Sequence, residues 1–407
     1  MHQVSGGAGA VERLTGDGET RPRYRPDVDG LRAIAIVSVV LFHAHVPMFG
    51  GGFVGVDIFF VISGFLIGGI VFRDVSRGRY SFTTFYARRA KRIVPALLGM
   101  SLVVSAMAIG LLPRDQLARF AQSSTAMLFG SANVHFWALT HYFGVDWEMD
   151  PLVMTWSLGV EEQFYLFLPP LILLLHRFAP RATVAVIVIL SLLSLALSEH
   201  WTGSQPSAAF YLLPGRAWEL GVGVLVALVK LRGRVWLSRG AAHWVSIAAL
   251  AAVIAAIALY TEETRFPGLA ATLPTLGTAA LILTEPSMVN RVLLASAPMR
   301  FIGLISYSWY LWHWPMMVFG RVALGGEPSP MMLALIIVIS FGAAVLSWRF
   351  LETRFRQPGT MSNPRLLRRY ALAILGCLGV AGVCYGIAMS GEASAAETVA
   401  RTDRNTV

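Results

Sequence analysis

Residues 31–48 read LRAIAIVSVVLFHAHVPM, an apolar run close to the ~20 residues that a helix needs to cross a lipid bilayer. The preceding residues are polar and rich in arginine, and they lack the apolar core of a signal peptide. Ten further apolar segments follow, at 52–72, 93–112, 155–175, 182–198, 208–229, 242–260, 267–284, 300–319, 331–350 and 369–389. The sequence therefore predicts an all-α polytopic membrane protein with about eleven transmembrane helices.

The composition of the 407-residue chain agrees with this fold class. Apolar residues make up 56% and charged residues only 14%, against ~25% charged in a typical soluble domain. The net charge of +10 comes from residues in short loops between apolar segments, so we expect no nucleic-acid partner. Cys377 and Cys384 lie in one apolar segment without metal-binding or disulfide spacing, and we expect no metal.

Segment 118–140 is a weaker twelfth apolar stretch, interrupted by polar residues. If it does not cross the membrane, most of the 33 lysine and arginine residues lie on the same side as the N-terminus. A full crossing would turn the later basic loops outward, against the positive-inside rule. We therefore predict a re-entrant or interfacial segment and a cytoplasmic N-terminus.

Ionisable side chains inside the predicted spans mark the functional region, because each costs at least ~2.5–3.5 kcal/mol in hydrocarbon. Arg32 and His43 lie on one face of the first span, since eleven residues make three turns plus about 20°, and they are separated by roughly 16 Å along its axis. Further groups lie at similar depth in other spans: Asp57, Glu161, Glu162, Arg216, Glu219 and His313. Groups so placed usually face a shared interior and pair with one another.

Four of these residues also have a purely structural interpretation. Arg216 and Glu219, three residues apart, suit an intrahelical ion pair. His313 stands in a tryptophan-rich stretch that is typical of an interfacial aromatic belt. Asp57 could cap the outer turn of the second span. The sequence leaves both interpretations open at each position.

A basic loop at 73–92 ends in Arg89 and Arg92, which are three residues apart on one helix face. Guanidinium groups bind phosphate through paired hydrogen bonds, so these residues with Arg32 predict an anion site at the cytosolic surface. The alternative is a positive-inside anchor without a ligand.

Seven motifs in order carry a family resemblance. They are YRPDVDGLR at 24–32, Arg32 with ten residues to His43, GVDIFFVISGFLI at 55–67, Arg89-x-x-Arg92-Ile93-x-Pro95, TWSLGVEEQFY at 155–165, RAWEL at 216–220 and ISYSWYLWHWP at 305–315. From about residue 24 to 356 the chain resembles the acyltransferase 3 family, membrane O-acyltransferases that modify bacterial glycans and some antibiotics. The predicted layout is a polar cytoplasmic tail at 1–23, this membrane domain at 24–356, a basic loop and final span at 357–390, and a short polar tail at 391–407.

The resemblance implies that an acyl group, commonly acetyl, passes from cytosolic acyl-coenzyme A to a hydroxyl group, in a protein of the bacterial inner membrane. It ties activity to the Arg32–His43 pair and to Arg89 and Arg92. On this basis we expect the arginines to bind coenzyme A and His43 to act as general base or acyl carrier. Glu161 or Asp57 would orient His43, and Arg216 would stabilise the oxyanion. Expected acceptor or supporting residues are Glu162, Tyr165, Glu219, Tyr307 and His313.

Two departures from the family pattern affect the expected acceptor. Met154 stands where many members have histidine, and a C-terminal SGNH-hydrolase-type domain is not found in the sequence. Delivery would then be direct or through a separate extracytoplasmic transferase. A cell-envelope glycan or lipid-linked saccharide is the expected acceptor, with a small glycoside such as a macrolide as the alternative. A proton-coupled transporter or flippase is the rival class, because intramembrane His, Asp and Glu also build proton relays.

Overall fold

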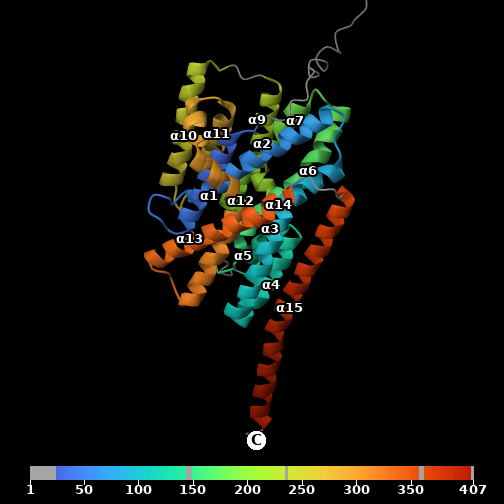
Figure 1. Cartoon of the computed structure of the whole chain (residues 1–407), viewed down its shortest axis with the longest axis vertical. Helices are drawn as coiled ribbons and strands as arrows, with labels where there is room; N and C mark the ends of the chain where they lie inside the picture. Colours follow the sequence, from blue (N-terminus) through green and yellow to red (C-terminus); the bar gives the residue numbers. More distant parts are fainter. Residues whose placement is uncertain (1–23, 144–148, 234–236, 357–361, 405–407) are drawn as a thin grey trace, which may run out of the picture.

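A computed structural model describes residues 24–143, 149–233, 237–356 and 362–404, and it omits the side chains of 141–143 and 391–404. Within these residues the chain consists of helices and connecting turns without a β-strand, which confirms the predicted all-α class (Figure 1). The predicted tail at 1–23 lies outside the described residues.

Each of the eleven predicted spans coincides with a helix. These helices are α1 (Pro26–His43), α2 (Gly55–Ser76), α3 (Phe82–Leu111), α6 (Trp156–Phe178), α7 (Thr183–Ser204), α9 (Leu213–Leu231), α10 (Arg239–Leu259), α11 (Thr272–Leu283), α12 (Ala297–Leu324), α13 (Pro330–Ser347) and α15 (Asn363–Arg404). Shorter elements connect them: η2 (Gly52–Val54), η3 (Val153–Thr155), α8 (Pro206–Tyr211), η4 (Gly268–Ala271), η5 (Val289–Leu294), η6 (Trp348–Glu352) and α14 (Thr353–Arg356).

Eight helical segments in the described part of the chain are long and apolar enough to cross a membrane. The other three predicted spans are α1, α11 and α12. Helix α1 carries three charged residues, α11 has only 12 residues, and α12 is rich in tryptophan and tyrosine and contains a histidine. The polar α1 and α12 are the helices that we expect to face the interior of such a bundle.

Segment 118–140 forms two helices instead of one. Helix α4 (Arg114–Leu128) and helix α5 (Ala132–Phe143) are separated by a turn in which Gly130 adopts a φ of +67°. A residue in this left-handed conformation ends a helix, and glycine adopts the conformation without a steric penalty. Helix α4 packs against α15, and α5 packs against α6 and α8. A continuous crossing helix is thus excluded here, and the re-entrant or interfacial placement stays a prediction.

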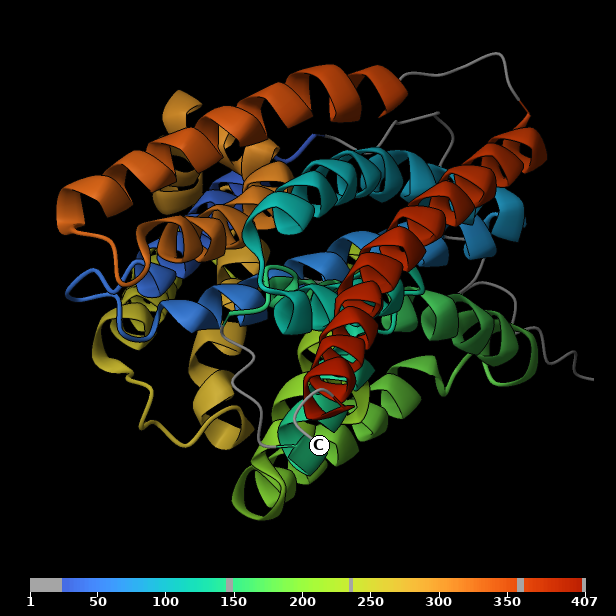
Figure 2. The same cartoon turned by 90° about the horizontal axis from the view of Figure 1, so that it is seen from below.

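Helix α15 extends beyond the predicted final span. Its backbone remains helical through Arg404, across most of the stretch expected to be a short polar tail. The alanine- and glutamate-rich sequence after 390 has high helix propensity, which accounts for the difference. Helix α15 packs against α3 and α4, and its C-terminal end projects beyond the other helices (Figures 1 and 2).

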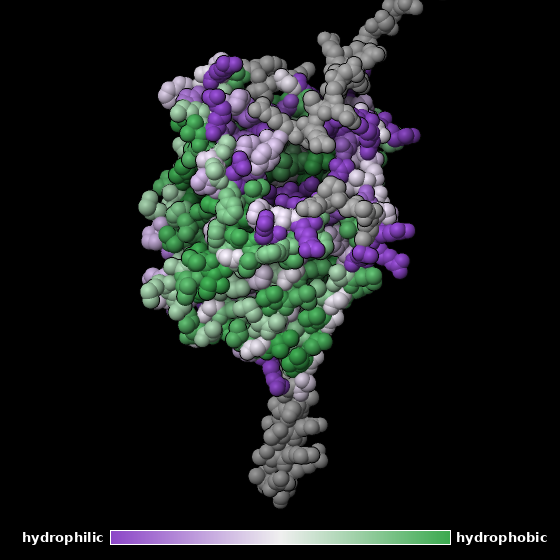
Figure 3. Space-filling model, viewed as in Figure 1, coloured by the Kyte–Doolittle hydropathy of each residue, from purple (hydrophilic) through white to green (hydrophobic). Residues whose placement is uncertain are grey.

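Apolar side chains cover much of the face in Figure 3, and hydrophilic ones gather toward its top and around a hollow in its upper half.

Close backbone approaches fix the two most extensive helix pairs, α1 with α12 and α2 with α9. A Cβ on Gly303 would lie 1.8 Å from the carbonyl oxygen of Asp29, and one on Gly64 would lie 1.9 Å from that of Leu220. Small residues allow such contacts, and membrane helices associate largely through them. These two glycines therefore set how closely α12 approaches α1 and α9 approaches α2.

The loop before η3 is held by Asp150. The Leu152 amide donates to its Oδ1 (2.8 Å), the Ser123 hydroxyl donates to Oδ2, and the Trp314 indole donates to its carbonyl oxygen (2.9 Å). Burial raises the pKa of Asp150 to about 6. Because no arginine or lysine of the described residues lies within ion-pair distance, the ionised carboxylate costs folding free energy at neutral pH.

We predict that Gly64→Ala lowers the thermal stability of the detergent-solubilised protein, by the equivalent of about 1–3 kcal/mol, because the added methyl group collides with the backbone of α9. Gly376→Ala is the matched control, since a Cβ there meets no atom within 4 Å. Equal melting temperatures for the two variants would contradict the assigned helix contact.

We predict that Asp150→Asn raises the melting temperature at pH 7.5 and gives a smaller gain at pH 5. The pKa of this carboxyl is higher in the folded than in the unfolded protein. At a pH below the unfolded pKa, near 4, the carboxyl is protonated in both states and its ionisation does not lower the stability. The penalty grows as the pH rises toward 6 and is complete above it. Thermal unfolding at the two pH values tests this, and a gain independent of pH would point to packing instead.

Candidate active site

A cavity opens between α1, α2, α3, α6 and α12 and holds ≈ 770 Å³ of empty space, counted with its open mouth. Seven of the predicted site residues line it: Arg32, Arg89, Arg92, Glu161, Glu162, Tyr165 and Tyr307. Residues from five helices and nearly 300 positions of sequence thus meet as one site.

The basic part of the cavity is formed by Arg32, Arg89 and Arg92. Arg32 has a loose ion pair with Asp29, at 4.0 Å. Among the described residues, no carboxylate lies within 4.0 Å of Arg89 or Arg92, and the buried Nε of Arg89 has no hydrogen-bond partner. A cluster of three guanidinium groups with one carboxylate of the described residues in range suits an anionic ligand such as a phosphate.

The polar wall opposite contains Glu161 and two tyrosines. Glu161 accepts hydrogen bonds from Ser63 (3.0 Å) and Tyr165 (2.5 Å). The Tyr307 hydroxyl donates to the carbonyl oxygen of Ile93 (3.0 Å), which ties α12 to the helix that carries the arginines. Glu161 is therefore fixed in position by α2 and by its own helix.

His43 lies outside the lining of this cavity and pairs with His313. The two rings stack at 5.3 Å between centroids, and Nδ1 of His43 lies 3.2 Å from Nε2 of His313. Nδ1 of His313 lies 2.8 Å from the Tyr310 carbonyl oxygen. A carbonyl only accepts, so Nδ1 of a neutral His313 carries the proton and its Nε2 accepts from His43. Nε2 of His43 is then the unprotonated nitrogen.

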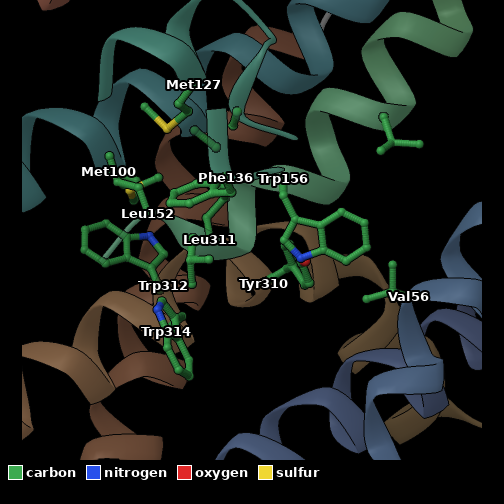
Figure 4. Packing of buried hydrophobic residues seen from close by; sticks show 14 of the residues in the cluster. Val56, Met100, Met127, Phe136, Leu152, Trp156, Tyr310, Leu311, Trp312 and Trp314 are labelled. Atoms are coloured by element: carbon green, nitrogen blue, oxygen red, sulfur yellow. The ribbon is translucent and has the colours of Figure 1, made fainter. Parts of the chain in front are cut away.

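Tyr310 separates the histidine pair from the cavity. It lines the cavity, and its ring lies 5.5 Å from the ring of His313. Its hydroxyl donates to the Met154 carbonyl oxygen (2.9 Å) and lies 2.8 Å from the Ser157 hydroxyl. Figure 4 shows Tyr310 next to Trp156, and Trp314 next to Trp312, within the cluster of buried hydrophobic residues. The histidines are thus one side chain beyond the end of the cavity.

Arg216, Asp57 and Glu219 form a separate cluster. Arg216 lies 3.2 Å from both carboxylates, and the side chains of all three are at most 1% exposed. Four aromatic rings surround its guanidinium at 5.3–5.9 Å, those of Phe60, Trp156, Phe210 and Phe266. The intrahelical ion pair that the spacing allowed is present, and Asp57 adds a partner from α2.

The structure therefore does not unite all predicted catalytic residues. Among the described hydrogen bonds and ion pairs, Asp57 and Glu161 bind other residues than His43, and Arg216 does not line the cavity. Their proposed roles as orienting groups and oxyanion donor stay predictions without a contact to support them. Sequence reasoning missed Ser63 and Tyr310 as site residues. Helical spacing places Tyr310 on the same face as His313 and Trp314, which was the available signal.

The chain is similar to a family of known acyltransferases. Residues 25–349 match the family model described as an acyltransferase domain. A putative membrane-bound transacylase, BcsY of Komagataeibacter xylinus, is 34% identical over 88% of this chain and 90% of its own length. O-acetyltransferase OatA of Staphylococcus aureus and the putative peptidoglycan O-acetyltransferase YrhL of Bacillus subtilis are each 31% identical, over 83% and 84% of this chain.

The chain spans little more than half of the length of the last two relatives, 58% of OatA and 56% of YrhL. No solved structure matches it. The family match nevertheless covers most of the chain, including every motif from Arg25 to His313. The chain is a membrane-embedded member of the acyltransferase 3 family.

Proposed function

We propose that this protein is an O-acyltransferase that moves an acyl group, acetyl in the first instance, from acyl-coenzyme A to a hydroxyl group of a cell-envelope glycan. The observation that carries the proposal is the cavity itself, which is lined by three arginines, two of them without a carboxylate of the described residues within 4.0 Å, and by Tyr310, whose ring lies 5.5 Å from that of His313. The placement is the bacterial inner membrane, with the arginines on the cytosolic side.

The arginines would hold the phosphate groups of the donor. Arg89 supplies a buried Nε–H without a partner, and Arg32 and Arg92 line the same space. Each charge-assisted hydrogen bond to a phosphate contributes about 1.5–3 kcal/mol. The remaining volume, flanked by tyrosine and phenylalanine side chains, suits the flexible arm that carries the thioester.

His43 would carry out proton or acyl transfer through Nε2. As a general base, Nε2 takes the proton of the acceptor hydroxyl while the hydroxyl oxygen bonds to the thioester carbonyl carbon. The departing thiolate then takes up this proton. As a nucleophile, Nε2 itself bonds to the carbonyl carbon and the thiolate leaves; the acceptor oxygen then bonds to that carbon, the Nε2–carbon bond breaks, and the hydroxyl proton goes to the thiolate. In both cases His313 holds the ring and the tautomer, because it accepts from Nδ1.

We predict that His43→Ala reduces acetyl transfer from [14C]acetyl-coenzyme A by about 10²–10⁴-fold, the usual contribution of a general base. His313→Ala should give a large loss as well, with partial recovery in His313→Gln, because an amide oxygen can accept the Nδ1 proton. His176→Ala, an exposed histidine at the end of α6, is the matched control. Normal activity in His43→Ala would refute both roles of His43.

We predict that Arg89→Ala and Arg92→Ala each raise the KM for acetyl-coenzyme A by at least about tenfold, the equivalent of 1.4 kcal/mol of lost binding. Arg88→Ala is the control on the same helix, since Arg88 is 56% exposed and pairs with Asp74 at 3.7 Å. Steady-state kinetics in nanodiscs provide the measurement. Absence of coenzyme A binding to the intact protein would remove the donor assignment and favour a transporter.

A further inference from the structure

A second, open groove lies beside the end of α1 and holds ≈ 940 Å³ of empty space. It is formed by the loop after His43 and the loop after α10. These two loops are neighbours in space, although more than 200 positions separate them in the sequence. Its lining includes Phe42, His45, Phe49, Thr261, Glu262 and Glu263. No role for these residues follows from the arginine-lined cavity, which shares none of them.

The groove adjoins the proposed reacting histidine. Phe42 lines it, and the ring of Phe42 lies 5.1 Å from the ring of His43. The chain turns sharply after His43, because the His45 amide donates to the Phe42 carbonyl (2.8 Å) and the Val46 amide to the Leu41 carbonyl (3.0 Å). This is the hydrogen-bond pattern of a Schellman motif, with His45 at a φ of +50° where glycine is usual. The turn places the groove directly next to the last turn of α1.

One wall of the groove, the loop after His43, is fixed to α10. The Gly51 amide donates to the carbonyl oxygen of Ile257 (3.0 Å), and a Cβ on Gly51 would lie 2.1 Å from that of Ala256. The loop after His43 therefore rests on the last turn of α10. A site with fixed walls loses less conformational entropy when it binds a ligand.

The charge of the groove is acidic. Glu262 and Glu263 are both exposed, and neither lies within 4.0 Å of a basic side chain of the described residues. Arg265, the arginine nearest in sequence, pairs with Glu199 at 3.3 Å instead. Within the lining that the structure describes, His45 is the one basic side chain. A cleft that carries charges of one sign repels ligands of the same sign, attracts ligands of the opposite sign and tolerates neutral ones.

We propose that this groove is the acceptor subsite and that it takes a neutral, hydroxyl-rich saccharide in preference to a polyanionic one. This inference rests on the proposed O-acyltransferase function. The two carboxylates accept hydrogen bonds from sugar hydroxyls, and Phe42 and Phe49 offer apolar faces to the ring carbons. The acceptor hydroxyl then reaches His43 from the side opposite to Arg32, which lies roughly 16 Å away along the helix axis.

The test compares acetyl transfer from [14C]acetyl-coenzyme A to two probes, a neutral glucan oligosaccharide and a uronic-acid oligosaccharide of equal length. The wild-type protein in nanodiscs should prefer the neutral probe by about tenfold or more at low salt, and less at 1 M salt, where charges are screened. The double variant Glu262→Lys/Glu263→Lys should shift the ratio at least about tenfold toward the anionic probe. Asp115→Lys, another exposed carboxylate outside both sites, should leave the ratio unchanged.

Release of coenzyme A without an acceptor is measured in parallel and separates the two proposals. If this release depends on His43 and is unchanged in the double variant, the donor reaction is intact and a shifted ratio supports the subsite. If release is intact but the ratio does not change, or the wild type acetylates neither probe, the acceptor subsite is overturned. If the wild type releases no coenzyme A, the proposed function itself fails.

Discussion

The cost of placing charge in hydrocarbon separates the structural from the functional ionisable groups of this protein. Arg216 is enclosed by two carboxylates at 3.2 Å and four aromatic rings, so its charge is compensated within the fold. Arg89 and Arg92 lie in the same bundle without a carboxylate at ion-pair distance among the described residues, and they face a cavity. Positive charge that the fold leaves uncompensated requires either water or an anionic ligand. The proposed donor site therefore differs from the Arg216 cluster in the lack, among the described residues, of carboxylates beside Arg89 and Arg92.

Helix α1 connects the steps that the proposed reaction needs. Arg32 lies toward one end of it and His43 at the other, and both the cavity and the acidic groove border this helix. Its position relative to α12 is set by the contact of Gly303 with the backbone at Asp29, and this same pair of helices brings His313 to His43. A displacement of α12 would thus change the donor cavity, through Tyr307, and the histidine pair together.

Helical periodicity and the cost of buried charge predict the helices, the placement of Arg32 and His43 on one helix face, and some of the charged residues that line the cavity. They do not predict which groups meet, because partners come from distant parts of the chain. Ser63 and Glu161 are 98 positions apart, Asp57 and Arg216 are 159 apart, and His43 and His313 are 270 apart. The spacing of residues along one helix determines which side chains share a face. Which residues of other helices contact that face depends on how the helices pack together. The expected contact of Asp57 or Glu161 with His43 follows the pattern of a catalytic triad, whereas in the structure His313 lies beside His43.

A histidine partner has a physical advantage at this position. A carboxylate beside His43 would be a buried charge and would need its own counter-ion, as Glu161 needs its two hydroxyl donors. A neutral His313 orients His43 through one hydrogen bond and is itself oriented by backbone carbonyls of α12, so no net charge is buried in the resting site. The arrangement keeps Nε2 of His43 unprotonated at a lower desolvation cost than an Asp–His pair, and it leaves the stabilisation of a transient imidazolium to the polar groups of the bound substrates.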